Sequence, residues 1–359
     1  MSDSRIAAHA RIIVKYSTAL KAGETVGIYG NTECIELVEA VYREAILAGA
    51  HPFIRLAIPS IAPFLYKYAT DAQLSRVTNL DWTEAKSQEA RVVILAESNT
   101  RALSQTDPSR MAVFAKARKP IREYLVDNTR WCLTLHPTQA LAQEAGMSLE
   151  AYKDFVYRAM FCDRRDAVAE WKKIEAMQDR LIRSIKGAKE ARIVGLDTDL
   201  RFSVKGRLFV NSTATHNLPS GEIFTAPVET STEGHIYFDI PSARDGNFIE
   251  GIRLKFHRGR VVEARAERGE TYLKKMLAMD DGASRLGEWG IGTNFGIQRP
   301  TGEILFDEKI GGTIHLALGS AYTECRGKNK SALHWDMIKD LRGGKGRIEV
   351  DGRELKVRK

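Results

Sequence analysis

The sequence has few cysteines and no long apolar run. Its 4 cysteines are far apart and form no C-x-x-C pair, so neither a disulfide framework nor a zinc knuckle is expected. No apolar stretch approaches the length of a membrane span, and the N-terminal segment lacks the apolar core and small-residue cleavage site of a secretory signal. These absences predict a cytoplasmic protein with no membrane partner.

The sequence also lacks a glycine-rich phosphate loop. The first predicted strand is followed by "GNTE" (30–33), and neither G-x-G-x-x-G nor a P-loop motif is present there, which argues against a Rossmann-type cofactor. The net charge of +8 comes from Lys and Arg interleaved with Glu and Asp. Without an aromatic-basic module, this charge indicates a solvated basic surface and no nucleic-acid partner.

The first part of the chain has the pattern of an open α/β sheet. Residues 25–57 contain a short apolar stretch, a turn, an amphipathic segment ending near Gly49, and a second apolar stretch, which together predict a β-α-β unit. Further buried strands are expected at 91–97 and 131–136. We therefore expect an α/β N-terminal domain with an open, parallel-type sheet.

The second half has a different pattern of apolar and polar residues. Residues 148–186 carry apolar residues at helical spacing, with Ser148 as an N-cap, and predict two helices that bridge the halves. Short alternating runs broken by Gly, Asn, Asp and Pro follow, which is typical of hairpins. The expected domains are an α/β domain with bridging helices over 1–185 and a mostly antiparallel α+β domain over 186–359.

The stretch "SALHWDMIKD" (331–340) contains a histidine and an aspartate two positions apart. Side chains at i and i+2 of a strand leave the same face, so His334 and Asp336 would point to one place while Trp335 points away. Such a pair can bind a metal, relay a proton or form a simple hydrogen bond. On its own the pair does not choose between these roles.

Other polar residues stand in apolar or glycine-rich surroundings of the same half. Glu222 lies between a Pro/Gly turn and a strand, Glu288 is expected after a short helix with glycines on both sides, and His315 has apolar neighbours that would bury it. The segment 305–322 adds Asp307, Glu308 and Tyr322. Oxygen donors plus two imidazoles suit two adjacent divalent ions such as Zn²⁺, Co²⁺ or Mn²⁺.

The motifs "GEIFTAP", "LGEWGIGTN", "DEK…HLALGSAY" and "NKSALHWDM" resemble those of the M29 family, the thermophilic metallo-aminopeptidases. This resemblance implies that Glu222, Glu288, Glu308, His315, His334 and Asp336 bind two divalent ions, with Tyr322 near the metals. The motif around Glu308 departs from the family, because Lys309 replaces an asparagine and the loop to His315 is two residues longer. Glu308 is therefore the ligand that the resemblance supports least.

The resemblance further implies a homodimeric aminopeptidase that removes N-terminal residues from short peptides. Two metals would bind the free α-amine, polarise the first peptide carbonyl and activate a bridging water. Glu222 or Glu288 would act as the general base. Tyr322 would either hydrogen-bond the oxyanion or pack beneath the site.

Two other functions remain open at this point. His315, His334 and Asp336 also form the set of two histidines and one carboxylate that binds a single Fe(II) in oxygenases, and dihydroxypyridine dioxygenases resemble distant relatives of this fold. Glu222 and Glu288 argue against this alternative, because a mononuclear site does not need them. A metal-free binding protein would have lost at least one ligand, yet only the Glu308 motif departs.

Overall fold

The computed structural model describes residues 3–244 and 246–357. The chain divides into two compact units, one made of Met1–Glu170 with Ala214–Pro219 and the other of Trp171–Thr213 with Ser220–Lys359. The expected boundary between residues 185 and 186 stays a prediction. Among the described residues, no helix combines the length and apolarity needed to cross a membrane.

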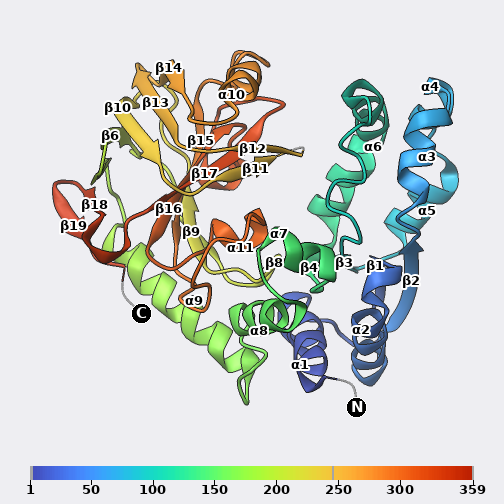
Figure 1. The fold of residues 1–359 in the computed structure, drawn as a ribbon. Coiled ribbons are helices and arrows are strands. Elements are labelled where there is room, and N and C mark those ends of the chain that lie inside the picture. Colours follow the sequence, from blue (N-terminus) through green and yellow to red (C-terminus); the bar gives the residue numbers. More distant parts are fainter. Residues whose placement is uncertain (1–2, 245, 358–359) are drawn as a thin grey trace. The chain divides into compact units, whose positions relative to one another are not determined.

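The first unit contains a five-stranded parallel sheet with the order β2-β1-β3-β4-β8 (Figure 1). The predicted β-α-β unit at 25–57 and the two later strands are confirmed. The strands are β1 (Thr25–Asn31), β2 (His51–Ala57), β3 (Ala90–Leu95), β4 (Arg130–Leu135) and β8 (Asn217–Leu218). The helices are α1 (Ser4–Ile12), α2 (Ile35–Leu47), α3 (Ile61–Tyr68), α4 (Asp71–Ser75), α5 (Asn79–Lys86), α6 (Pro108–Asn128), α7 (Gln139–Glu144) and α8 (Leu149–Ala159).

The two helices predicted over 148–186 are α8 and α9 (Ala167–Ser184). The Ser148 side chain accepts a hydrogen bond from the Ala151 amide at 3.3 Å, which confirms the N-cap. The boundary between the two units falls inside α9, at Glu170.

The second unit consists mainly of two antiparallel sheets, in agreement with the predicted α+β class. One has the order β14-β13-β10-β6-β5-β18-β19 and the other β17-β16-β15-β9-β7. The strands are β5 (Glu190–Gly195), β6 (Thr198–Ser203), β7 (Val210–Ser212), β9 (Glu222–Thr225), β10 (Glu233–Phe238), β11 (Ser242–Arg244), β12 (Asn247–Ile249), β13 (Ile252–His257), β14 (Arg260–Arg265), β15 (Leu286–Gly292), β16 (Thr313–Gly319), β17 (His334–Asp340), β18 (Gly346–Val350) and β19 (Arg353–Leu355). Two short helices, α10 (Glu270–Leu277) and α11 (Ile304–Asp307), complete the unit.

One apolar core joins the two large sheets of the second unit. It contains Phe202 of β6 together with Trp289 of β15 and Trp335 of β17. The rings of Phe202 and Trp289 meet edge to face with centroids 5.2 Å apart, a favourable aromatic geometry. The strands β9, β15, β16 and β17 direct Ile223, Trp289, Leu316 and Trp335 into this core. The side chains that alternate with these residues therefore lie on the opposite face of the sheet.

His9 of α1 lies buried in the first unit. Its Nε2 atom is 2.7 Å from the Thr134 hydroxyl, which itself donates to the Leu218 carbonyl at 2.8 Å. Because the Thr134 hydroxyl uses its single proton in the hydrogen bond to Leu218, the His9 ring must donate the hydrogen bond to Thr134. Burial, with a smaller contribution from His136, lowers the pKa of His9 to about 3 from 6.5.

We expect His9 to destabilise the fold in acid. The unfolded chain binds a proton at this ring below pH 6.5 whereas the folded chain does not, so stability falls as pH decreases through that range. His9→Gln keeps a donor for Thr134 and removes the titration. Between pH 7 and 5 its free energy of unfolding in urea should fall by about 2 kcal/mol less than that of the parent protein. The matched variant His51→Gln, at an exposed ring, should follow the parent, and an identical pH response of the two variants would contradict a neutral buried His9.

Candidate metal centre

Four neighbouring strands of the second unit present polar side chains on one face of their sheet. The H-x-D pair shows the alternation: Trp335 lies in the core, while His334 Nε2 and Asp336 Oδ2 are 3.6 Å apart. The strand predicted from this pair is β17. The residues gathered on this face are Glu222 of β9, Glu288 of β15, His315 of β16, and His334 and Asp336 of β17.

Glu288 reaches this face because of a β-bulge. Leu286 lies opposite Leu318 and Glu288 lies opposite Ala317, so the register shifts between Leu286 and Glu288. Leu286 belongs to the core, and regular alternation would place Glu288 there too. The extra residue turns the carboxylate to the other face. The short helix expected before Glu288 is wrong, because residues 281–284 form turns and Glu288 lies within a strand.

Gly290 makes room for the His315 imidazole. The two residues are direct partners of β15 and β16, and a Cβ atom at Gly290 would lie 2.0 Å from the ring. Any larger residue would therefore displace the imidazole. The sequence analysis noted the glycines around Glu288 but missed this role, which requires knowledge of the strand register.

Backbone carbonyls orient both imidazoles. His315 Nδ1 lies 2.9 Å from the carbonyl oxygen of Glu308, and His334 Nδ1 lies 2.8 Å from that of Ser320. A carbonyl oxygen only accepts, so Nδ1 carries the proton in both rings. The Nε2 atoms are thereby left to face the carboxylates, the arrangement that prepares histidine to bind a metal.

The carboxylates surround these Nε2 atoms closely. His315 Nε2 is 3.3 Å from Glu222 Oε2 and 3.4 Å from Glu288 Oε1. His334 Nε2 is 3.3 Å from Glu288 Oε2. Glu288 thus lies between the two imidazoles, with one oxygen directed to each.

Three overlapping groups of potential ligand atoms result, with the atoms of each group within 4.8 Å of one another. Glu308, the residue with the weakest support from sequence, belongs to one of them. All six predicted ligands are therefore brought together, although their role as ligands stays a prediction. The groups are Glu222, Glu288 and His315; Glu288, His334 and Asp336; and Glu308, His315 and Asp336.

The donor set fits divalent ions. Glu222 Oε2 and Asp336 Oδ1 are buried and have no hydrogen-bond partner within the described ranges, and such buried oxygens are costly unless a cation or donor meets them. A neutral imidazole with its proton on Nδ1 also directs a lone pair at the carboxylates. A cation between these groups, either a proton on the ring or a metal ion, would provide a partner for the carboxylate oxygens. It would also remove the repulsion between the imidazole lone pair and the carboxylates.

Lys309 lies at the buried end of the cluster. Its side chain is 0% exposed, its Nζ atom contacts Glu308 Oε1, and it is 3.6 Å from Glu222 Oε1. The side chain of His334, at the other end, is 29% exposed. The cluster is therefore closed at Lys309 and accessible at His334.

Tyr322 lies beside the accessible end. It is 45% exposed, and its ring centroid is 5.1 Å from that of His334 and 5.4 Å from that of Phe224. The tyrosine therefore packs against a predicted ligand on one side while part of it meets solvent. This position is compatible with either role expected from the sequence.

Burial and the neighbouring charges shift the acidity of these groups. Burial raises the pKa of Glu222 to about 7 and that of Asp336 to about 6. For Glu288 burial acts in the same direction, but the hydrogen bonds and charges of His315 and His334 outweigh it and lower the pKa to about 2. Burial lowers the pKa of the two imidazoles, yet the carboxylates prevail and raise it to about 10.

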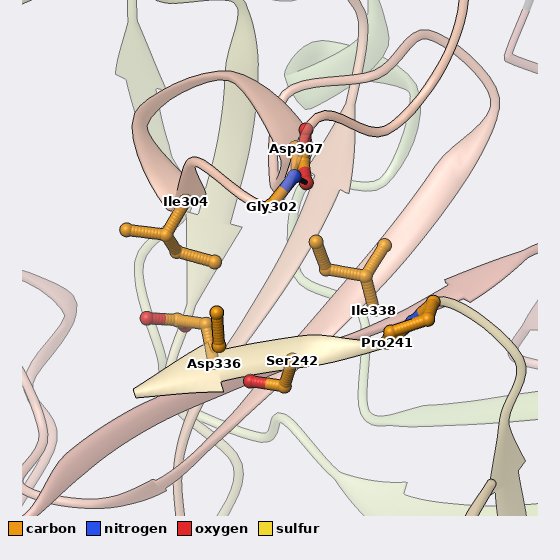
Figure 2. A pocket seen from close by; sticks show the side chains of 8 residues that line it. Pro241, Ser242, Gly302, Ile304, Asp307, Asp336 and Ile338 are labelled. Atoms are coloured by element: carbon orange, nitrogen blue, oxygen red, sulfur yellow. Dashed lines mark hydrogen bonds between the residues drawn. The ribbon is translucent and has the colours of Figure 1, made fainter. Parts of the chain in front are cut away.

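A small pocket adjoins Asp336 (Figure 2). Asp307 also borders it, but its carboxylate accepts hydrogen bonds from the Thr301 and Gly302 amides, both at 2.8 Å. Asp307 thus stabilises the turn before α11 and does not join the three groups above. The pocket is lined by Pro241, Ser242, Ala243, Gly302, Ile304, Asp307, Asp336 and Ile338.

Comparisons with known proteins identify two similar aminopeptidases. Aminopeptidase 2 of Geobacillus stearothermophilus is 27% identical over 96% of this chain and 92% of its own. Aminopeptidase T of Thermus thermophilus is 30% identical over 71% of this chain and 70% of its own.

Two solved structures share the fold. Wild-type AmpT from Thermus thermophilus has a TM-score of 0.82 at 23% identity, covering 96% of this chain and 94% of that one. A 2,5-dihydroxypyridine dioxygenase from Pseudomonas putida has a TM-score of 0.58 at 14% identity, covering 98% and 94%. At these identities the likeness concerns the fold alone.

The family comparison covers nearly the whole sequence. The model described as thermophilic metalloprotease (M29) matches residues 2–357, a span that includes all six predicted ligands and Tyr322. On this match the chain belongs to the thermophilic metalloprotease family M29, a family of metal-dependent peptide hydrolases.

Proposed function

We propose that this protein is an aminopeptidase that removes N-terminal residues from short peptides with two divalent metal ions. The observation that carries the proposal is the convergence of three carboxylates and two imidazoles on one sheet face, joined by the Glu308 carboxylate from the end of α11. Family membership and the relatives named aminopeptidases support the same activity. Zn²⁺, Co²⁺ and Mn²⁺ all suit this donor set.

The chain's own residues would hold the ions and orient the substrate. His315, His334, Glu222, Glu288, Glu308 and Asp336 supply the donor atoms. Bound divalent ions would polarise the scissile carbonyl and activate a water molecule at neutral pH. The peptide approaches from the His334 side, because the Lys309 end is closed by buried side chains.

Proton transfer is assigned to one of the two buried glutamates. Glu222 or Glu288 accepts a proton from the attacking water and returns it to the leaving amine. Glu222 faces one imidazole, with its Oε2 atom 3.3 Å from His315 Nε2, while Glu288 directs one oxygen to each of the two imidazoles. Tyr322 donates a hydrogen bond from its phenolic hydroxyl to the oxyanion from the accessible end.

The Fe(II) dioxygenase alternative receives less support. None of the three ligand groups found among the described residues joins both imidazoles with Asp336. Glu288 instead lies within 3.4 Å of each ring. The likeness to the dihydroxypyridine dioxygenase is one of fold.

We also infer that the protein is cytoplasmic and that, as the family resemblance implies, it is a homodimer. The buried, unpaired cysteines suit a reducing compartment. The mass of the assembly in solution, compared with the 40.1 kDa of one chain, would test the dimer.

His334→Ala should remove bound metal and abolish hydrolysis. The ring is a predicted ligand at the accessible end, where its loss disturbs little packing. Metal content per chain by mass spectrometry, Leu-p-nitroanilide hydrolysis and thermal unfolding would be measured together. The control is His257→Ala, a surface histidine of the same unit paired with Glu233. Full activity and metal content in His334→Ala would remove this site from consideration.

Glutamine substitutions should separate the base from the ligands. Glu288→Gln is expected to reduce kcat at least about 100-fold, whereas Glu303→Gln should leave it near the parent value because glutamine keeps the oxygen that caps α11. Glu222→Gln is measured in parallel. The variant that retains metal but loses turnover identifies the base, and equal effects at 288 and 303 would show that Glu288 is assigned wrongly.

Tyr322→Phe should lower kcat about 100-fold if the phenol stabilises the oxyanion. KM and metal content should stay unchanged, because the ring remains in contact with His334 and Phe224. Tyr237→Phe, in the same unit but outside the cluster, serves as the control. An unchanged kcat in Tyr322→Phe would mean that this residue only packs against the site.

A further inference from the structure

Lys309 is a buried cation inside the predicted metal cluster. Its side chain is fully enclosed, contacts Glu308 and lies 3.6 Å from Glu222 Oε1. A buried ammonium needs anionic partners of this kind, since an unpaired charge at such a place is strongly unfavourable. Glu222 and Glu308 are thus partly neutralised by the chain itself.

The backbone fixes Lys309 in this position. Its amide donates to the Phe306 carbonyl at 3.0 Å, and its carbonyl accepts from the Asn294 amide at 3.0 Å. Ile310, the next residue, forms a bridge with Asn294. These contacts fix the backbone at Lys309, and the enclosure of its side chain keeps the ammonium group beside Glu222 and Glu308.

The lysine affects the three ligand groups unequally. Glu222 belongs to one group and Glu308 to another, so each of these groups contains a carboxylate that Lys309 engages. The third group, Glu288, His334 and Asp336, contains no carboxylate within ion-pair distance of Lys309, although the Lys309 charge acts on Asp336 from farther away. A divalent ion placed in either of the first two groups would also meet the repulsion of a positive charge a few Å away.

We propose that Lys309 acts as a resident cation at one of the two metal positions, so that the positions differ strongly in affinity. This inference rests on the proposed function. One ion binds tightly to Glu288, His334 and Asp336 at the accessible end. A second ion binds only after the ammonium has released Glu222 and Glu308.

Metal titration of the full chain tests this inference. Metal-free protein would be dialysed against stepped concentrations of free Co²⁺ and the bound metal counted by mass spectrometry. In the parent protein, the second ion should bind at a free Co²⁺ concentration at least about tenfold higher than the first. Repulsion between the two ions also separates these concentrations, so the same ratio is measured in a variant without the lysine charge. Lys309→Met removes the charge and keeps the length of the side chain. It should therefore reduce the ratio between the two binding concentrations at least about tenfold.

Lys339→Met is the matched control. Lys339 is another fully buried lysine of the same unit, but it contacts the Tyr237 carbonyl at 2.9 Å and Asp239 and none of the predicted ligands. It should titrate like the parent. Two ions of equal affinity in the parent, or the same ratio in Lys309→Met as in the parent, would overturn the inference and leave the dinuclear aminopeptidase intact. A parent that binds no metal would instead overturn the proposed function.

A measurement on the unmodified chain covers the case in which Lys309→Met does not fold. Protein given one equivalent of Mn²⁺ should show the electron paramagnetic resonance signal of an isolated ion at full intensity. Spin coupling between neighbouring ions should appear only when excess Mn²⁺ is added. Spin-coupled pairs at one equivalent of Mn²⁺ would mean that both positions fill together. This result would contradict the proposal that the Lys309 ammonium occupies one of them.

Discussion

The alternation of side chains across the five-stranded sheet is the constraint on which the site depends. One face must join the apolar core through Trp289, Leu316 and Trp335, so the register of every strand is fixed by burial. A slip of one residue would move the ligands into the core and the tryptophans out of it. The hydrophobic effect that stabilises this unit therefore also holds the carboxylates and imidazoles in register.

Alternation alone would not assemble the cluster, and two local features are needed in addition. The bulge before Glu288 places this carboxylate on the ligand face, and the missing side chain at Gly290 admits the His315 ring. Lys309 is a third such feature. Its ammonium group balances part of the negative charge of the clustered carboxylates when no metal is bound. The resulting balance of charge keeps four closely spaced carboxylates compatible with a folded chain.

Local sequence patterns predicted much of this structure. The β-α-β unit at 25–57, the Ser148 cap and the shared face of His334 and Asp336 follow from spacing within a few residues. The strand β8 and the bulge could not be predicted, because both depend on pairing between distant segments. The helix expected before Glu288 is wrong for a local reason, because the Asp280 side chain accepts hydrogen bonds from the Gly282 and Ala283 amides and thereby stabilises turns at 281–284. The contact of Lys309 with Glu222, like the bulge, joins residues from different elements.

The imidazoles are oriented by the carbonyl groups of Glu308 and Ser320, which are backbone atoms. In many metal sites a second carboxylate performs this task and can be lost by a single substitution. Here a change of side chain at residue 320 leaves its carbonyl in place. The groups that orient the two rings are therefore retained when the side chains at 308 and 320 change, so this part of the geometry depends on the path of the backbone and not on the identity of these two residues.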